Sequence, residues 1–212
     1  MQILDDIGQA LEKGKRKLVI QYVQQAIDEG IDPQTILSEG LLPGMDRIGV
    51  KFRINEVFVP EVLVAARAMN AGTELLKPLL GDENGTSLGT AVIGTVKDDL
   101  HDIGKNLVRM MMEGKGIQVI DLGVDVEPKT FIQSAVDNHA ELVCCSALLT
   151  TTMPMMAEVV KEAEAAGIRD QIKIMVGGAP VTQEFCDSIG ADCYTDDAAS
   201  AALCAAQLLS AK

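Results

Sequence analysis

The first eighty residues carry apolar side chains at a spacing of three and four, which places them on one face of a helix. Such stripes begin at Ile3, Leu18, Leu37 and Val62. Asp32 followed by Pro33 is typical of an N-cap and a first-turn proline, and Pro43 predicts a kink in the helix that follows. Four helices can enclose one small core, so we predict a four-helix bundle in residues 1–82.

Beyond residue 89 the pattern changes to short aliphatic runs that are separated by segments with helical spacing. The runs are TAVIGTV, GIQVIDLG, AELVCCSALL, QIKIMVGG and the weaker ADCYTD. This alternation predicts an α/β fold: a Rossmann-like (flavodoxin-like) five-stranded parallel sheet domain in residues 89–212, with helices on both faces. The polar, Gly-rich stretch GDENGTSLG lies between the two patterns, so we expect a linker at residues 83–88.

Ligands of such parallel sheets bind at the carboxyl ends of the strands. Four strand-to-helix loops converge there, at residues 97–103, 123–128, 146–152 and 177–181. The first loop lies in VKDDLHDIGKNL, which holds three Asp and one of only two His in the chain. It lacks the Gly and the Ser or Thr of a phosphate loop, no GxGxxG follows the first strand, and no aromatic residue is available to stack on a flavin.

Composition excludes several classes of partner. Thirty-one acidic against eighteen basic residues give a formal net charge of −13, which disfavours nucleic acids and anionic lipid surfaces. No apolar run approaches the roughly 20 residues of a membrane span, so we expect a cytoplasmic protein with no membrane partner. The spacing of the five Cys matches neither a disulfide framework nor a zinc clamp, which predicts reduced thiols.

Asp99 and His101 have the spacing at which a carboxylate can hold one imidazole nitrogen while the other faces a metal ion. The alternative is a His that is hydrogen-bonded at a helix N-terminus, with Asp102 as the cap. One His provides too few ligands for zinc, which needs three or four from the protein. A metal ion at His101 would therefore bring its other ligands with it, as a macrocycle does.

The spacing of seven residues resembles the cobalamin-binding domain of corrinoid-dependent methyltransferases. That pattern is DxHxxG, forty-one residues, SxL, twenty-six to twenty-eight residues, and GG. The matching residues, with gaps of forty-one and twenty-eight, are Asp99, His101, Gly104, Ser146, Leu148, Gly177 and Gly178. The helical half, VFVPEVLVAARAMNAG above all, is similar to the cap domain of methionine synthase and of the small corrinoid proteins of methanol, methylamine and aryl-methyl-ether metabolism.

The resemblance implies that cobalamin (methylcobalamin or a related corrinoid) is the cofactor and that His101 is the lower axial ligand of its cobalt. Asp99 would hold the other ring nitrogen, and the hydroxyl of Thr152 would complete a proton relay. Thr152 stands where relatives usually have Ser, and capping of the helix near Pro154 is the alternative. Asp98 stands where relatives usually have Gly, and we assign it no role.

Further residues are placed at the cofactor by the same resemblance. Asp102 and Ile103 follow the ligand, and a slot for the displaced nucleotide tail would be lined by Ser146, Leu148 and Thr150. Room in this slot would be left by Gly104, Gly177 and Gly178, although a turn with positive φ also explains the paired Gly. Phe58 and Val62 would shield the upper face of the corrin. A place in the bundle core is the alternative for this segment, and we favour it for Val62.

The function implied is that of a corrinoid protein that carries a methyl group on cobalt and is not catalytic alone. Its partners would be a substrate-specific methyltransferase, a second methyltransferase with tetrahydrofolate or a thiol as acceptor, and a reductive activase. O-demethylase and other one-carbon systems use such carriers, so the methyl donor stays open. The rival function is the cobalamin-binding subunit of an adenosylcobalamin-dependent mutase, which lacks the helical cap. A cobalamin-sensing regulator would need a DNA-binding segment, for which the chain has no spare residues.

Overall fold

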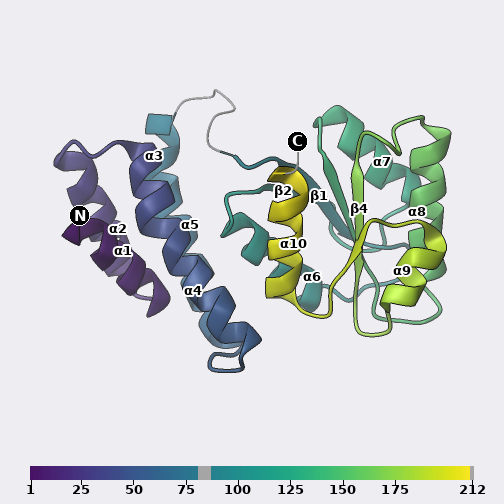
Figure 1. Cartoon of the computed structure of the whole chain (residues 1–212), viewed down its shortest axis with the longest axis horizontal. Helices are drawn as coiled ribbons and strands as arrows, with labels where there is room; N and C mark the ends of the chain where they lie inside the picture. Colours follow the sequence, from purple (N-terminus) through teal and green to yellow (C-terminus); the bar gives the residue numbers. More distant parts are fainter. Residues whose placement is uncertain (81–86, 211–212) are drawn as a thin grey trace. The chain divides into compact units, whose positions relative to one another are not determined.

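The computed structural model describes residues 1–80 and 87–210. It separates into two compact units: Met1–Ser87 form most of the first, and Leu88–Glu113 with Ile117–Lys212 form the second (Figure 1). Most of the linker predicted at residues 83–88 lies outside the described residues. None of the helices in the described part of the chain has both the length and the apolar character needed to cross a membrane.

The first unit is helical throughout. Its elements are α1 (Gln2–Glu12), α2 (Arg16–Asp28), α3 (Pro33–Thr35), the π-helical η1 (Ile36–Leu41), α4 (Leu42–Arg53) and α5 (Val59–Leu80). Because α3, η1 and α4 follow one another without a break, the described residues of this unit form four helical rods, as predicted. Asp32 caps the third rod by accepting a hydrogen bond from the Thr35 N–H (3.0 Å). At Pro43 the π-helical turns change to α-helix.

The apolar stripes of the sequence form the core of this helical unit. α2 packs against both α1 and α5, and α4 packs against α1 and α5. Fully buried side chains come from every rod and include Ile7, Leu11, Val19, Val23, Leu41, Ile48 and Leu76. The apolar side chains whose spacing predicted the helices are therefore the same side chains that pack in the core of this unit.

The second unit has a five-stranded parallel sheet in the order β2-β1-β3-β4-β5. The strands are β1 (Thr90–Thr95), β2 (Gln118–Asp121), β3 (Leu142–Ser146), β4 (Lys173–Gly177) and β5 (Cys193–Tyr194). The helices are α6 (Ile103–Glu113), α7 (Pro128–Asp137), α8 (Pro154–Ala165), α9 (Gln183–Ile189) and α10 (Ala198–Ser210). α6 packs beside α10 on one face, and α7, α8 and α9 cover the other (Figure 1). The prediction of a Rossmann-like sheet behind a helical region is confirmed.

The strand register brings the last residues of three strands to one edge. Thr95 of β1 pairs with Ser146 of β3, which in turn pairs with Gly177 of β4. The order β2-β1-β3 means that the chain leaves β1 toward one side of the sheet and β3 toward the other, which opens a crevice between their loops. The loop that carries His101 starts at this point.

The cysteines differ in part from the prediction. Cys144, Cys145 and Cys186 are free and buried, as small apolar side chains. Burial raises the pKa of Cys144 to about 12, so this thiol is unreactive at neutral pH. Cys193 and Cys204, by contrast, form a disulfide, with Cα atoms 7.4 Å apart. The prediction of reduced thiols is wrong for this pair, because spacing along the chain does not show that β5 and α10 place the two side chains together.

Candidate functional site

Asp99 is the centre of a hydrogen-bond network at the carboxyl edge of the sheet, and its side chain is fully buried. One carboxylate oxygen, Oδ1, lies 2.7 Å from His101 Nδ1 and accepts from the His101 backbone N–H (3.1 Å). The other, Oδ2, accepts from the Leu148 and Leu149 N–H groups (2.8 and 3.3 Å) and from the Thr152 hydroxyl (2.8 Å). Loops after β1 and β3 are thus joined through one carboxylate.

These bonds keep Asp99 ionised. Burial by itself raises the pKa of this carboxyl, but the hydrogen bonds from His101, Leu148 and Thr152 together hold the pKa well below its usual range. A carboxylate can only accept hydrogen bonds, so His101 Nδ1 must donate. In the neutral ring, Nε2 is then left with a free lone pair. The network therefore fixes the imidazole tautomer that can bind a metal ion through Nε2.

The His101 ring stands in an open, apolar surround. Half of its side chain is exposed (51%), although Asp99 beneath it is fully buried. Leu100 on the same loop and Ile103 at the start of α6 are 71% and 79% exposed, and Leu148 and Leu149 on the neighbouring loop are exposed as well. Four large apolar side chains exposed around one imidazole form a surface that a large, partly apolar ligand would cover.

The three glycines of the motif occupy their positions for different structural reasons. Gly178 has φ +133°, and a Cβ there would lie 1.8 Å from the Ala147 carbonyl oxygen, so only glycine fits. Gly104 has no atom within 4 Å of the Cβ position, and Gly177 has one only at 3.9 Å. Neither has a φ in the left-handed region. The backbone conformation and the close Ala147 carbonyl therefore explain why residue 178 is a glycine. At Gly104 and Gly177 the backbone does not require glycine, but the open space beside them is what a slot for a ligand requires.

The remaining predicted residues lie partly in the α/β unit and partly in the helical unit. Asp102 directly precedes α6 and accepts from the Asn106 side chain (3.0 Å), and Ser146 is partly buried at the end of β3. Thr150 is exposed on the loop after β3. In the helical unit Phe58 is 62% exposed, whereas Val62 is fully buried on α5 and so occupies a core position. Of these two, only Phe58 presents side-chain surface to a ligand.

Thr152 lies in the network rather than at a helix cap. The residue at the N-cap of α8 is Met153, and no side chain caps this helix. The Thr152 hydroxyl lies 2.8 Å from Asp99 Oδ2 and 2.9 Å from the Leu149 carbonyl oxygen. Because a carboxylate is the stronger acceptor, the single hydroxyl proton is directed to Asp99. The Thr152 hydroxyl is therefore bonded to Asp99 and Met153 occupies the N-cap of α8.

Two features of the His101 loop escaped sequence reasoning. Thr95, fully buried at the end of β1, donates a hydrogen bond to the His101 carbonyl oxygen (2.8 Å). Its only sequence signal is a hydroxyl at the last position of a strand. Asp98 has φ +63°, in the left-handed region where glycine is favoured and Asp is tolerated. This conformation is one that a Gly at position 98 would adopt without strain.

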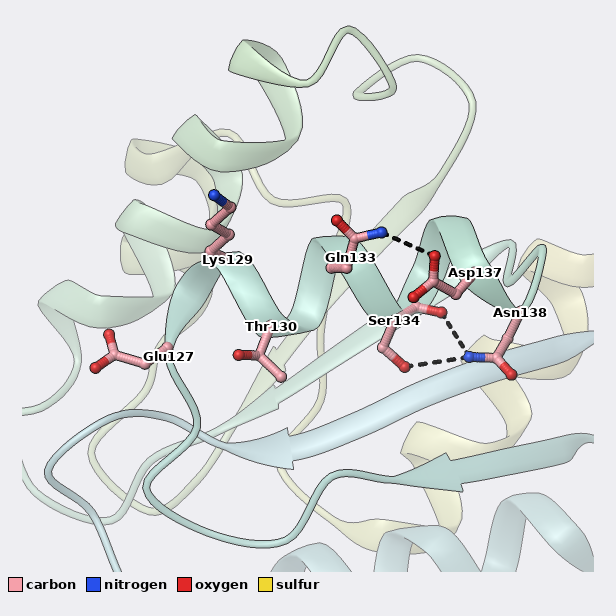
Figure 2. A pocket seen from close by; sticks show the side chains of 7 residues that line it. All are labelled: Glu127, Lys129, Thr130, Gln133, Ser134, Asp137 and Asn138. Atoms are coloured by element: carbon pink, nitrogen blue, oxygen red, sulfur yellow. Dashed lines mark hydrogen bonds between the residues drawn. The ribbon is translucent and has the colours of Figure 1, made fainter.

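A second hollow runs along α7, with a volume of about 590 Å³. Figure 2 shows that the side chains around it come from one helix and the residues directly before and after it, and that Gln133 bonds Asp137 while Asn138 bonds Ser134. Its lining is Glu127, Lys129, Thr130, Gln133, Ser134, Asp137 and Asn138. The predicted site residues are absent from this lining, and two pairs of its polar residues bond each other, as on a solvated helix face.

Protein ligands for a metal ion are scarce in this chain. Within residues 1–80 and 87–210, no group of three or more His, Cys, Asp or Glu side chains is placed to hold an ion. His101 could therefore bind a metal ion only if that ion arrived with its other ligands. A flat metal macrocycle meets this condition.

Comparisons with known proteins agree with this geometry. A family described as a B12 binding domain matches residues 89–203, and a second family with the same description matches residues 3–77. The chain thus consists of the two parts of a B12-binding protein.

Individual relatives cover almost the whole chain. Dimethylamine corrinoid protein 1 of Methanosarcina acetivorans is 40% identical over 209 residues, 98% of each chain. Trimethylamine corrinoid protein 1 of the same organism is 41% identical over 199 residues, 93% of this chain and 92% of the relative. A crystal structure of a methanol:cobalamin methyltransferase complex from Methanosarcina barkeri superposes with a TM-score of 0.89 at 30% identity, covering 100% of this chain and 81% of that one. The chain belongs to the family of corrinoid methyl-carrier proteins, and its cofactor is a cobalamin.

Proposed function

We propose that this chain presents His101 as the lower axial ligand of a corrinoid cobalt and carries a methyl group between two methyltransferases. The proposal rests mainly on the Asp99–His101 pair, in which a fully buried carboxylate lies 2.7 Å from Nδ1 of a half-exposed imidazole. When bound, the cobalt centre supplies the nucleophile that accepts and releases the methyl group. The protein contributes the ligand, its orientation and its protonation.

Each residue of the network has a distinct part in this proposal. Asp99 fixes the Nδ1–H tautomer of His101, so that Nε2 is the free donor atom. The Thr152 hydroxyl and the Leu148 N–H hold Asp99 in place and stabilise its charge. The low pKa of Asp99 keeps that carboxyl ionised, so it would accept a hydrogen bond from the Nδ1–H of His101 whether or not Nε2 holds a metal ion.

The apolar rim and the glycines complete the cofactor seat in this proposal. Leu100, Ile103 and Leu148 would support the corrin from below and exclude water from its lower face. Gly104 and Gly177 would leave room for the nucleotide tail, with Ser146 and Thr150 as hydroxyl contacts. The helical unit, residues 1–82, would act as the cap, with the exposed Phe58 against the upper face.

The proposed partners are a substrate-specific methyltransferase, a second methyltransferase with tetrahydrofolate or a thiol as acceptor, and a reductive activase. The crystal structure of a methyltransferase complex among the structural neighbours supports the first of these. The names of the relatives span dimethylamine, trimethylamine and methanol, at 30–41% identity. We therefore propose that the partner enzyme, and not the carrier, selects the methyl donor.

The test is electron paramagnetic resonance of the Co(II) form of the full chain reconstituted with hydroxocobalamin. The unpaired electron should couple to a protein nitrogen in the wild-type protein, and this splitting should disappear in His101→Asn. The matched control is His139→Asn, which changes the only other His, at a position with φ +50° that Asn tolerates. When the histidines carry 15N and the cofactor does not, 15N splitting that persists in His101→Asn, or is absent from a loaded wild-type protein, would show that His101 is not the ligand.

A further inference from the structure

Asp125 lies in the loop between β2 and α7 and touches the His101 loop at two points. Its carboxylate Oδ1 accepts a hydrogen bond from the Asp98 N–H (2.7 Å). Its own backbone N–H donates to the Asp99 carbonyl oxygen (3.0 Å). One residue thus bonds the backbone of the two residues that precede Leu100 and His101, although its side chain is exposed and the sequence motif does not include it.

The backbone held by these bonds is in a conformation that needs support. Asp98 and Asp125 both have left-handed φ values, +63° and +55°. Residues other than glycine occupy this region only when the surroundings determine it. Asp125 supplies this condition at Asp98, since its carboxylate accepts the Asp98 N–H, and its own N–H is held by the Asp99 carbonyl oxygen. Without the Asp125 carboxylate, the Asp98 N–H would be satisfied by water, which does not fix the direction of the chain.

The position of this backbone decides where the imidazole points. The His101 ring is held through the Asp99 side chain, so a shift of the Asp99 main chain moves the Nδ1 acceptor with it. Thr95 holds the same loop from below, through the His101 carbonyl oxygen. Asp125 holds it from the side, and together they fix residues 98–101 before any ligand arrives.

We propose that Asp125 is a positioning residue that keeps the His101 ring aimed at the corrinoid metal. This inference rests on the proposed function of His101 as the axial ligand. Asp125 touches neither cofactor nor reacting atoms in this proposal. Its effect is to raise the fraction of bound cofactor in which the imidazole is attached, because a preorganised ligand loses less conformational freedom on binding.

The variants are chosen to separate this role from a general loosening of the loops. Asp125→Gly removes the carboxylate and accommodates φ +55° without strain. Asp125→Asn keeps a side-chain oxygen acceptor and tolerates the same φ. Glu127→Gln is the matched control, because the Glu127 ion pair with Lys97 joins the same two loops without touching the backbone of residues 98–99.

The first measurement is the ratio of His-attached to His-free cofactor, taken from visible absorption and electron paramagnetic resonance of cobalamin-loaded full chain at one pH. We expect Asp125→Gly to shift this ratio about tenfold toward the free form, as for loss of a charge-assisted hydrogen bond. Asp125→Asn should shift it by about threefold or less, and Glu127→Gln should leave it unchanged. Equal ratios in Asp125→Gly and wild type, or an equal shift in Glu127→Gln, would overturn the proposal.

The second measurement uses the protein without cofactor and is independent of the proposed function. Amide hydrogen exchange at Asp98 and His101 should be about tenfold faster in Asp125→Gly than in wild type, and unchanged in Glu127→Gln. Unchanged exchange in Asp125→Gly would refute positioning by Asp125 even if His101 binds cobalt. Faster exchange in a chain whose His101 shows no nitrogen coupling would instead uphold the positioning of the loop and refute the axial-ligand role.

Discussion

In the helical unit every buried side chain that the structure describes is apolar, whereas the α/β unit also buries Thr95, Asp99, Lys105 and Thr152. Burying a polar group is unfavourable unless its hydrogen bonds are satisfied. Three of these four residues bond within the His101 network, and Lys105 bonds Asp121 (2.5 Å) from the first turn of α6. The difference shows that the described interior of the helical unit is apolar throughout, while the α/β unit concentrates its buried polar side chains at the edge that carries His101.

The same contrast extends to the surface. The exposed large apolar side chains of the α/β unit include Leu100, Leu148 and Leu149 on the two loops that Asp99 joins, and Ile103 at the start of α6. Buried polar and exposed apolar groups thus occur together, which inverts the usual distribution at this one edge. Such an inversion marks a binding site, since a ligand that covers the apolar groups is stabilised by the polar ones beneath.

The largest expected effect on stability is for a substitution at Gly178, where the backbone of Ala147 leaves no space for a side chain. Gly178→Ala should destabilise the α/β unit by more than about 3 kcal/mol, because the new Cβ would clash with the Ala147 carbonyl oxygen at an unfavourable φ. Segment-resolved hydrogen exchange checks this, with loss of protection in β3 and β4 and retention in α1 and α2. Gly190→Ala is the control: its φ is +73° but the space is open, so the cost should be about 1 kcal/mol.

The next largest effect is the pH-dependent loss of stability in Asp121→Asn, which tests the contrast between the polar and the apolar interior. Burial by itself raises the pKa of Asp121, but the hydrogen bonds from Lys105 and the Gly123 N–H, with the Lys105 and Arg109 charges, lower it overall. A carboxyl with a lowered folded pKa stabilises the fold above its unfolded value of about 4 and loses this contribution as the pH falls through the folded value. Asp121→Asn should therefore cost about 2 kcal/mol at pH 7, and this difference from wild type should shrink below about pH 4.

Urea denaturation of wild type and Asp121→Asn across this pH range measures the effect. Leu41→Ala in the helical unit is the comparison, since it removes a fully buried apolar side chain. Its cost should be about 3 kcal/mol and the same at every pH at which the fold persists. A pH-independent cost for Asp121→Asn would contradict the distinction between the two interiors.

The smallest effect is expected at Thr152. Thr152→Val preserves the shape of the side chain but removes the hydroxyl from Asp99, so the free energy of unfolding should fall by about 1 kcal/mol. Thr152→Ser keeps the hydroxyl and should remain within about 0.5 kcal/mol of wild type. Thermal denaturation of the three proteins distinguishes these outcomes. Equal losses in Val and Ser variants would assign the cost to packing and not to the hydrogen bond.

Most of the architecture could be predicted, because each element is encoded within a few neighbouring residues. The five aliphatic runs contain the five strands, and Asp32 with Pro33 marks the start of the third helical rod. The Asp99–His101 pair was equally accessible, since only two positions separate its members. Thr95 and Asp125 were missed: a hydroxyl at a strand end and an Asp in a turn are common, and their partners lie in other parts of the fold. The Cys193–Cys204 pair was missed for the same reason.

By itself the sequence determined the order and type of the elements and the presence of an imidazole beside its carboxylate at a strand end. Periodicity suffices for this, because side-chain direction repeats every 3.6 residues in a helix and every two in a strand. Only the tertiary structure decided that the Thr152 hydroxyl, 53 residues away, reaches Asp99, and that Asp125 holds the backbone beside it. Hydrogen bonds are decided by tenths of an ångström and by direction, and these are set only when the sheet and its loops have packed.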